Sequence, residues 1–209
     1  MDTSLLITAF VTLFVVIDPI ALTPLFVALT RGRSDAARRA IALRACGVAI
    51  GLLTLFGLLG DAVLNFVGIS MPAFQIAGGI LLFLTALDML FERRTKRREG
   101  QAHEGEEAED DPSVFPLAMP LIAGPGAMAT MVLLAGAPGT SWSAVLEVHL
   151  VMIVVILVVF GFFRFAGLLE RALGTVGINV VTRLLGMLLA ALSVQFVVNG
   201  VRALGLMPV

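Results

Sequence analysis

Asp18-Pro19-Ile20-Ala21-Leu22-Thr23-Pro24 lies inside an apolar run long enough to cross a membrane, and so does Pro120-Leu121-Ile122-Ala123-Gly124-Pro125-Gly126. In both stretches the two prolines stand five residues apart. Proline removes a backbone donor and clashes with the preceding turn, so a helix in lipid carries such a break only where protein or a water-lined cavity satisfies the freed groups. Paired breaks at corresponding places in two halves of a chain indicate the binding site of a transporter.

The composition predicts a membrane protein. Apolar residues make up 59% of the chain, against roughly 45–50% in soluble domains, and the mean hydropathy is +1.03. A spanning helix needs about 20 mostly apolar residues, and no segment has the alternating polarity of membrane β-strands. We therefore expect an all-α, multi-pass protein with six transmembrane helices: Leu5 to Leu29, Ile41 to Gly60, Ser70 to Phe91, Val114 to Leu134, Val145 to Phe165 and Leu184 to Leu206.

The basic residues predict the orientation in the membrane. All but one of the 14 Lys and Arg residues lie in or beside the segments that follow the first, third and fifth spans, and the exception is Arg202. The positive-inside rule places those three segments in the cytoplasm and both termini outside. Trp142, between the fourth and fifth spans, then fits an anchor at the outer interface.

Residues 99–111 differ from the rest of the chain because acidic residues crowd there around Gly and Ala. Such a segment repels itself and stays solvated, so we expect a flexible cytoplasmic linker. On either side of it, residues 1–98 and residues 112–209 each hold three expected spans.

The two halves also resemble each other in their third spans, where Gln75 to Leu82 can be aligned with Thr182 to Leu189. Three is an odd number of spans, so the second half must enter the membrane from the side opposite to the first. The fold class that we expect is therefore two inverted three-helix repeats, with spans 1 and 4 broken at their Pro and Gly residues.

The breaks offer groups that bind charged solutes. Asp18 followed by Pro19 has the pattern of a helix that restarts in mid-membrane, with Asp as the N-cap and Pro at the first helical position. Gly124 and Gly126 let backbone approach closely, and amides at such a helix start can receive a carboxylate. A carboxyl group at the depth of Asp18 is costly and is expected to be functional; the alternative is that it only caps the half-helix.

Other polar residues of the spans have two interpretations. Gln195 and Asn199 stand four residues apart on one helix face, so they either line a polar path or bond between helices. Asp18 and Asp88 are candidates for coupling to protons or sodium, although Asp88 lies close enough to the basic cluster at Arg93 for an interfacial ion pair. We expect no metal or other cofactor. The predicted substrate-binding residues are Asp18, Pro19, Thr23, Pro24, Pro120, Gly124, Pro125, Gly126, Gln195 and Asn199.

The middle of the spans contains no Lys or Arg. We therefore expect no fixed cation in the membrane interior, which makes phosphates and dicarboxylates poor candidates for the substrate. A small zwitterion or neutral solute fits better, with its carboxylate on half-helix amides and its ammonium on Asp18 or on freed carbonyls.

At these residues the chain resembles the MarC family of bacterial membrane proteins. Asp18 to Phe26 keeps the two prolines and the phenylalanine of the family pattern but departs from it at Ala21 and Leu22. Pro116 to Ala127 is typical throughout, and Arg183 to Leu188 and Val194 to Gly200 resemble the last span. The resemblance implies a bacterial inner-membrane protein that moves small neutral amino acids as an exporter or exchanger.

The sequence also allows functions other than transport of amino acids. One alternative is a membrane scaffold or receptor subunit without transport, although a scaffold would not need two matched helix breaks. Another alternative is a pore for small neutral solutes. An intramembrane enzyme is disfavoured, because neither Asp18 nor Asp88 has the sequence setting of a protease dyad and no hydrolase motif is present. The net charge of −1 gives no reason to expect nucleic acid as a partner. The expected partners are the lipid bilayer, the amino acid substrate and further copies of the chain in a homo-oligomer.

Overall fold

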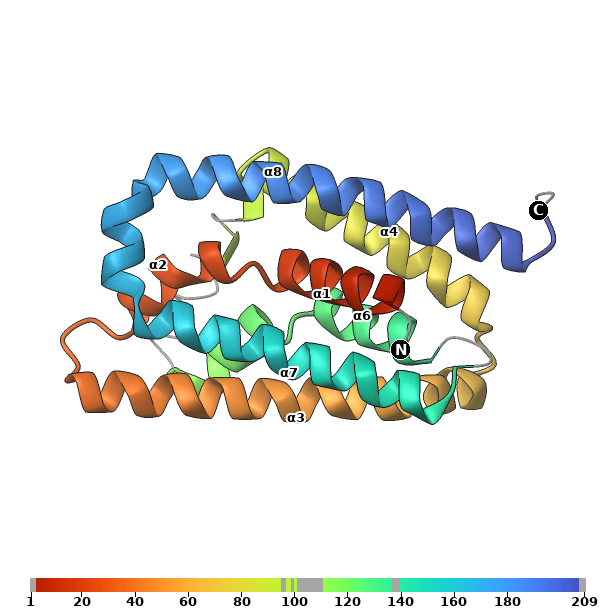
Figure 1. The fold of residues 1–209 in the computed structure, drawn as a ribbon, viewed down its shortest axis with the longest axis horizontal. Helices are drawn as coiled ribbons and strands as arrows, with labels where there is room; N and C mark the ends of the chain where they lie inside the picture. Colours follow the sequence, from red (N-terminus) through yellow and green to blue (C-terminus); the bar gives the residue numbers. More distant parts are fainter. Residues whose placement is uncertain (1–2, 95–96, 99, 101–110, 137–139, 207–209) are drawn as a thin grey trace.

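The computed structural model describes residues 3–94, 97–98, 100, 111–136 and 140–206. Within these residues all regular elements are helices, which confirms the all-α class (Figure 1). Most helices lie side by side along the long axis of the molecule. In chain order they are α1 (Thr3–Ile17), α2 (Pro19–Leu29), α3 (Asp35–Val67), α4 (Met71–Leu90), η1 (Ser113–Ile122), α6 (Pro125–Ala135), α7 (Trp142–Arg164) and α8 (Ala166–Ala203).

Five helical stretches of the described chain are long and apolar enough to cross a membrane, which confirms the multi-pass prediction. They are Thr3–Leu29, Asp35–Val67, Met71–Leu90, Trp142–Arg164 and Arg171–Ala203. The pair formed by η1 and α6, bent by 58°, is a sixth candidate.

Two helices extend well beyond the apolar segments that mark them in the sequence. α3 has 33 residues and α8 has 38. The segment expected as a loop between the last two spans is therefore helical, with a bend at Gly174, where φ is +59°. Hydropathy marks only the part of a helix that lies in lipid, so it misses the charged turns that continue the same helix.

α1 and α2 are separated by a single residue, Asp18, with left-handed backbone angles (φ 57°, ψ 69°). Its carboxylate accepts a hydrogen bond from the Ala21 amide (3.3 Å), so it caps α2, and Pro19 occupies the first turn, where a missing N–H is harmless. The chain thus stops and restarts a helix within one apolar stretch.

η1 and α6 contain the second stretch rich in Pro and Gly. Within η1 the residues Phe115 and Met119 have extended rather than helical angles, so the segment is irregular. Gly124 is extended and precedes α6, which begins at Pro125. A Cβ on Gly124 would lie 2.6 Å from the backbone oxygen of Pro120, so this turn requires glycine.

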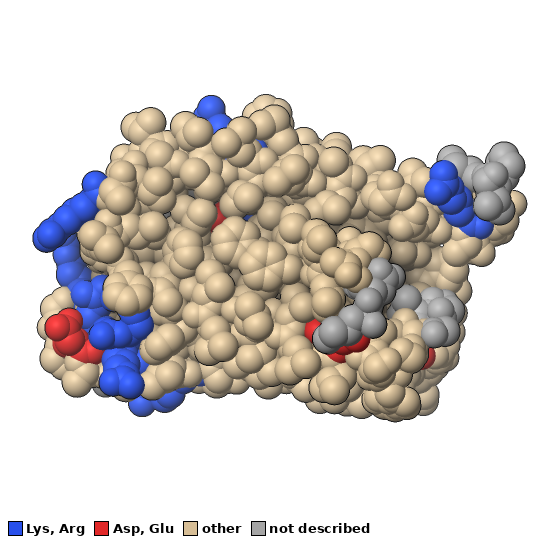
Figure 2. Space-filling view, in the orientation of Figure 1, with Lys and Arg blue, Asp and Glu red and all other residues tan. Residues whose placement is uncertain are grey.

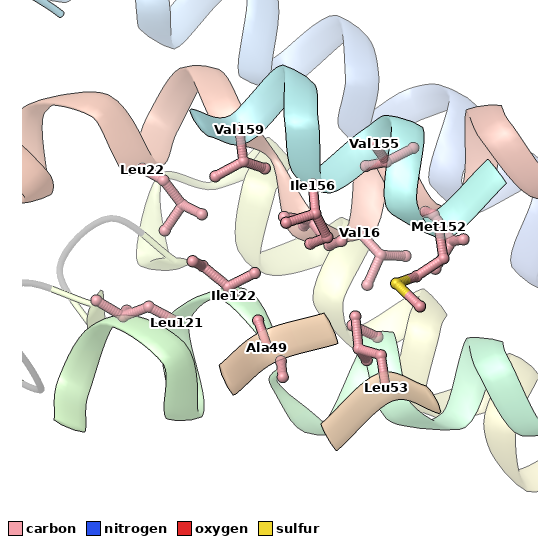
Figure 3. Close-up of a cluster of buried hydrophobic side chains, with 14 of the residues drawn as sticks. Val16, Leu22, Ala49, Leu53, Leu121, Ile122, Met152, Val155, Ile156 and Val159 are labelled. Atoms are coloured by element: carbon pink, nitrogen blue, oxygen red, sulfur yellow. The ribbon is translucent and has the colours of Figure 1, made fainter. Parts of the chain in front are cut away.

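The core lies where α1, α3, α7 and η1 meet, as Figure 3 shows. Val16 of α1, Ala49 and Leu53 of α3, Ile122 of η1 and Ile156 of α7 are all buried there. Helices in lipid gain little from the hydrophobic effect and associate through close packing, which the small Ala49 allows. Helices from both halves of the sequence therefore share one core.

Charge is distributed unevenly along the molecule. Figure 2 shows Lys and Arg gathered at one end, where α2 leads into α3 and α7 leads into α8. This is the end that we expect to face the cytoplasm. The predicted acidic linker lies almost entirely outside the described residues; its last residue, Asp111, forms an ion pair of 2.9 Å with Arg44 of α3.

The pKa of the Asp111 carboxyl is below its ordinary value. Partial burial acts to raise it, but hydrogen bonding with Ser113 and the positive charge of Arg44 outweigh that effect. The ionised carboxylate thus ties the start of the second half to α3.

α4 and α8 form an interface in which small residues let the two backbones approach closely. A Cβ on Gly79 would lie 2.8 Å from the Ser193 carbonyl oxygen and 3.1 Å from the Val197 amide nitrogen. A Cβ on Gly200 would lie 2.9 Å from the Pro72 carbonyl oxygen. These neighbours are backbone atoms, which cannot rotate away as side chains can.

We therefore expect Gly79→Ala to lower the free energy of unfolding by about 1–3 kcal/mol, the usual range for overpacking. Thermal unfolding of the purified protein in detergent measures this effect. Gly51→Ala is the matched control, because a Cβ there meets nothing within 4 Å and alanine is the better helix former by about 1 kcal/mol. Equal stabilities of the two variants would contradict the close approach of α4 and α8.

Candidate functional site

The two breaks lie side by side in the structure. A Cβ on Gly126, in the first turn of α6, would lie 3.1 Å from a methyl carbon of Val16, in the last turn of α1. A cavity of about 60 Å³ adjoins this contact. Its walls come from α1, α4, the segment after α4, η1 and α6: Val16, Thr85, Arg94, Arg97, Arg98, Pro120, Leu121, Ile122, Gly124, Pro125, Gly126 and Ala127.

Two arginines reach into the first break from the segment that follows α4. Arg94 donates a hydrogen bond to the Val16 carbonyl oxygen, and Arg98 donates one to the Ile17 carbonyl oxygen (3.0 Å). Both side chains are buried, at 5% exposure. The expectation that the interior contains no fixed cation is therefore wrong, because it considered only arginines within the spans.

These bonds follow from the helix break. The last carbonyls of a helix have no partner within it, and the end carries a partial negative charge. Because α1 ends inside the protein, its carbonyls at Val16 and Ile17 need donors that the chain brings from elsewhere. Guanidinium groups supply both the hydrogen bonds and the opposite charge.

Arg94 and Arg98 line the cavity, and Asp18, which does not, lies close enough for its charge to act on both of them. Asp18 is fully buried and uses only one carboxylate oxygen, Oδ1, to cap α2. Within the described part of the chain its Oδ2, the Nε of Arg94 and the Nη1 of Arg98 have no hydrogen-bond partner. Buried polar groups are nearly always paired with protein, water or ligand, so this cluster indicates a place where a polar molecule binds.

Burial lowers the pKa of Arg94, and the charge of Asp18 opposes that shift. Burial also lowers the pKa of Arg98, and the neighbouring charge of Arg94 adds to the effect. With Arg97 and Asp88, whose charges also act on Arg94, three cations and two carboxylates leave the surroundings with an excess positive charge. A bound anionic group would stabilise both guanidinium ions.

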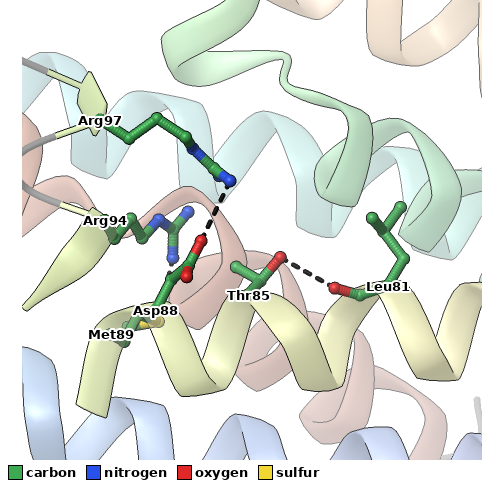
Figure 4. Close-up of polar contacts among 6 residues, drawn as sticks. All are labelled: Leu81, Thr85, Asp88, Met89, Arg94 and Arg97. Carbon is green, nitrogen blue, oxygen red and sulfur yellow. Dashed lines mark hydrogen bonds and ion pairs between the residues drawn. The ribbon is translucent and has the colours of Figure 1, made fainter. Parts of the chain in front are cut away.

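Asp88 lies at the rim of this cavity rather than among the buried groups. Its carboxylate forms an ion pair of 3.0 Å with Arg97, and more than half of the Arg97 side chain is exposed. One turn earlier, the Thr85 hydroxyl donates to the Leu81 carbonyl oxygen (3.0 Å) (Figure 4). A role for Asp88 in ion coupling stays a prediction.

The remaining predicted residues fall into two groups. Pro19, Thr23 and Pro24 lie in α2 just after the break, and the Thr23 hydroxyl donates to the Pro19 carbonyl oxygen (2.8 Å). Gln195 and Asn199 lie elsewhere: they are exposed on α8 and bond to each other at 2.8 Å. The structure does not bring these two amides to the cavity between the breaks.

Besides Arg94 and Arg98, sequence reasoning missed one more buried polar residue, His149 of α7. Its Nδ1 lies 2.7 Å from the Val145 carbonyl oxygen, and its buried Nε2 has no partner among the described residues. A Cβ on Gly57 would lie 2.7 Å from that Nε2, so the imidazole occupies space that glycine provides. An isolated polar residue in an apolar span is the signal that marks it.

The fold and the site together define a multi-pass helical membrane protein with a buried, charged cavity between two interrupted helices. Residues 3–204 match the family described as MarC family integral membrane protein, and the chain belongs to this family. No solved structure matches it.

Curated relatives cover nearly the whole chain. A UPF0056 membrane protein of Aquifex aeolicus is 39% identical over 96% of this chain and 94% of its own length. UPF0056 membrane protein MJ1677 of Methanocaldococcus jannaschii is 35% identical over 97% of this chain and 98% of its own length. UPF0056 membrane protein YhcE of Escherichia coli is 36% identical over 93% of this chain and 91% of its own length. These names describe membrane proteins and state no transported solute or enzymatic activity.

Proposed function

We propose that this protein is a secondary transporter of small neutral amino acids, acting as an exporter or exchanger in the bacterial inner membrane. The observation that carries the proposal is the cluster of unpartnered polar atoms at Asp18, Arg94 and Arg98, buried where two interrupted helices meet. Intramembrane charged residues that face a cavity commonly mark a substrate path.

The chemistry of the cluster fits a zwitterion. The free donors of Arg94 and Arg98 suit a carboxylate, since guanidinium groups bind carboxylates with strong, oriented hydrogen bonds. The N-terminal end of α6 adds a positive dipole on the same cavity. The free Oδ2 of Asp18 suits an ammonium group. An amine without a carboxylate would leave the arginines unpaired, which disfavours it as a substrate.

The cavity is small in this conformation. Its volume of about 60 Å³ corresponds to about two water molecules in the liquid. A whole amino acid therefore requires the surrounding helices to move apart, as a carrier that opens to one side at a time would do. Discontinuous helices between inverted repeats are the usual setting for such movement.

The remaining parts of the proposal concern topology and energy. The halves formed by residues 1–98 and 112–209 are inverted repeats, with both termini outside. Asp18 and Asp88 are the candidates for coupling transport to protons or sodium. The basic end of the molecule in Figure 2 supports a cytoplasmic placement of the connection between α2 and α3.

Exchange of labelled alanine, serine, glycine and threonine in proteoliposomes tests the function, with and without proton or sodium gradients. We expect saturable exchange of at least one of the four, competed by the others. Ethylamine and propionate, which each lack one charge of the zwitterion, should compete much more weakly. Failure of all four amino acids under every gradient would overturn the proposal and favour a scaffold without transport.

A further inference from the structure

A second cavity, of about 70 Å³, lies at the basic end of the molecule and shares no lining residue with the site described above. Elements from four helices surround it: the end of α2, the start of α3, the end of α7 and the start of α8. Its lining includes three arginines, Arg38, Arg39 and Arg164, and one acid, Asp35.

Two stacked phenylalanines form the apolar part of its wall. The rings of Phe26 and Phe163 are nearly parallel, with centroids 4.3 Å apart, and both are buried. The guanidinium carbon of Arg38 lies 5.6 Å from the centroid of the Phe26 ring. This cation–π contact holds the Arg38 charge at the cavity rather than in bulk solvent.

The arginine charges are not neutralised by the described protein. In the part of the chain that the structure covers, neither Arg38, Arg39 nor Arg164 has a carboxylate oxygen within 4.0 Å. Asp35 lines the same cavity without such an ion pair. The cavity therefore carries an excess of positive charge.

The position of the cavity at the end of apolar helices favours a ligand from the membrane surface. Arg164 is the last residue of α7, a candidate span, and Arg38 and Arg39 precede Ile41, the first buried apolar residue of α3. These guanidinium groups thus lie where apolar helix gives way to charged sequence, which is the headgroup region of a bilayer. Basic pockets between helices at the cytoplasmic surface suit anionic lipid headgroups.

We propose that this cavity binds the phosphate of an anionic phospholipid. Guanidinium groups present paired N–H donors that match phosphate oxygens, and three of them converge here from two helices. Phe26 belongs to α2 and Phe163 to α7. A lipid bound by Arg38 and Arg164 therefore bridges α3 and α7, beside the stacked rings that join α2 to α7.

Thermal unfolding in phosphatidylcholine-containing micelles, titrated with phosphatidylglycerol, tests the proposal without any transport assay. We expect phosphatidylglycerol to stabilise the wild type in a saturable way. Each arginine near an anionic surface contributes about 1 kcal/mol, so Arg38→Gln should weaken the apparent affinity about fivefold. The triple variant R38Q/R39Q/R164Q should lose the saturable stabilisation.

The control variant R31Q/R171Q/R202Q removes the same charge outside the cavity lining and should respond like the wild type. An equal loss in both triple variants would show that only general charge attraction is at work and would overturn the proposal. Inorganic phosphate at millimolar concentration should not reproduce the stabilisation; if it does, the site binds free phosphate and the lipid assignment is wrong.

Asp35→Asn keeps the proposal testable if the triple variant does not fold. Removing this carboxylate from the cavity takes away repulsion of an anion, so phosphatidylglycerol should bind several-fold more tightly. Weaker or unchanged binding would mean that the cavity does not receive a phosphate.

Discussion

Replacing Arg98 with Gln is expected to reduce alanine exchange in proteoliposomes by about thirtyfold or more. Truncating one partner of a buried, hydrogen-bonded charge pair generally costs about 2–5 kcal/mol. Arg98 is buried, bonds to the end of α1 and has a free Nη1 at the cavity. Glutamine keeps some hydrogen bonding but removes the charge that we assign to the substrate carboxylate.

Arg97→Gln is the comparison variant, because Arg97 lines the same cavity but is mostly exposed and pairs with Asp88 instead of binding the buried end of α1. Exposed ion pairs contribute at most about 1 kcal/mol, so its effect on exchange should stay within about fivefold. Arg98→Lys, which keeps the charge, should fall between the two. If Arg98→Gln exchanges alanine as fast as Arg97→Gln, the buried arginine does not bind the substrate.

Asp18→Asn is expected to abolish exchange or to slow it at least tenfold, with a loss of stability. Asparagine caps helices about as well as aspartate and tolerates left-handed backbone angles. The change therefore keeps the break and removes only the charge. Arg94 and Arg98 then lose the nearby charge of Asp18, and removing the partner of a buried charge costs about 3–5 kcal/mol.

Measurements of exchange and of thermal unfolding on the same preparation separate the two effects of Asp18→Asn. Asp88→Asn is the control for stability alone, because Asp88 is itself a coupling candidate; it removes a carboxylate of the partly exposed pair with Arg97 and should change stability by less than about 1 kcal/mol. Wild-type exchange and stability in Asp18→Asn would mean that Asp18 only caps α2.

Hydropathy located most of the helices closely. The span expected from Ser70 to Phe91 corresponds to α4 at Met71–Leu90, and the span expected from Val145 to Phe165 corresponds to α7 at Trp142–Arg164. The length of an apolar segment is a strong signal, because a segment crossing lipid must satisfy its own backbone hydrogen bonds and a helix does so. Hydropathy could not predict the charged turns by which α3 and α8 extend beyond their apolar segments.

The buried arginines could not be recognised from composition, because Arg94 and Arg98 belong to a run of basic residues typical of a cytoplasmic loop. Their spacing of four residues would place both on one face of a helix, with Arg93 and Arg97 on another. This spacing is the feature of the sequence from which a shared role of Arg94 and Arg98 could have been predicted. Only the three-dimensional structure shows that this face turns inward to the end of α1.

Gln195 and Asn199 show what the spacing of residues along one helix leaves undecided. Polar residues in a span attract a functional interpretation, yet these two satisfy each other on the exposed face of α8. A sequence gives the spacing of two side chains along one helix. Whether a neighbouring helix covers these side chains depends on long-range packing.

The glycine contacts between α4 and α8 have a mechanical consequence. The close backbone approach at Gly79 and Gly200 leaves little room for α4 and α8 to shift past each other, so we expect this helix pair to stay together as one rigid unit in the proposed carrier. The elements that move in the proposed carrier would then be α1, α2, η1 and α6. The interruptions at Asp18 and Gly124 would serve as their hinges. Inhibitors that wedge between those four segments should immobilise the carrier, whereas ligands of the outer surface of α8 should leave its cycle untouched.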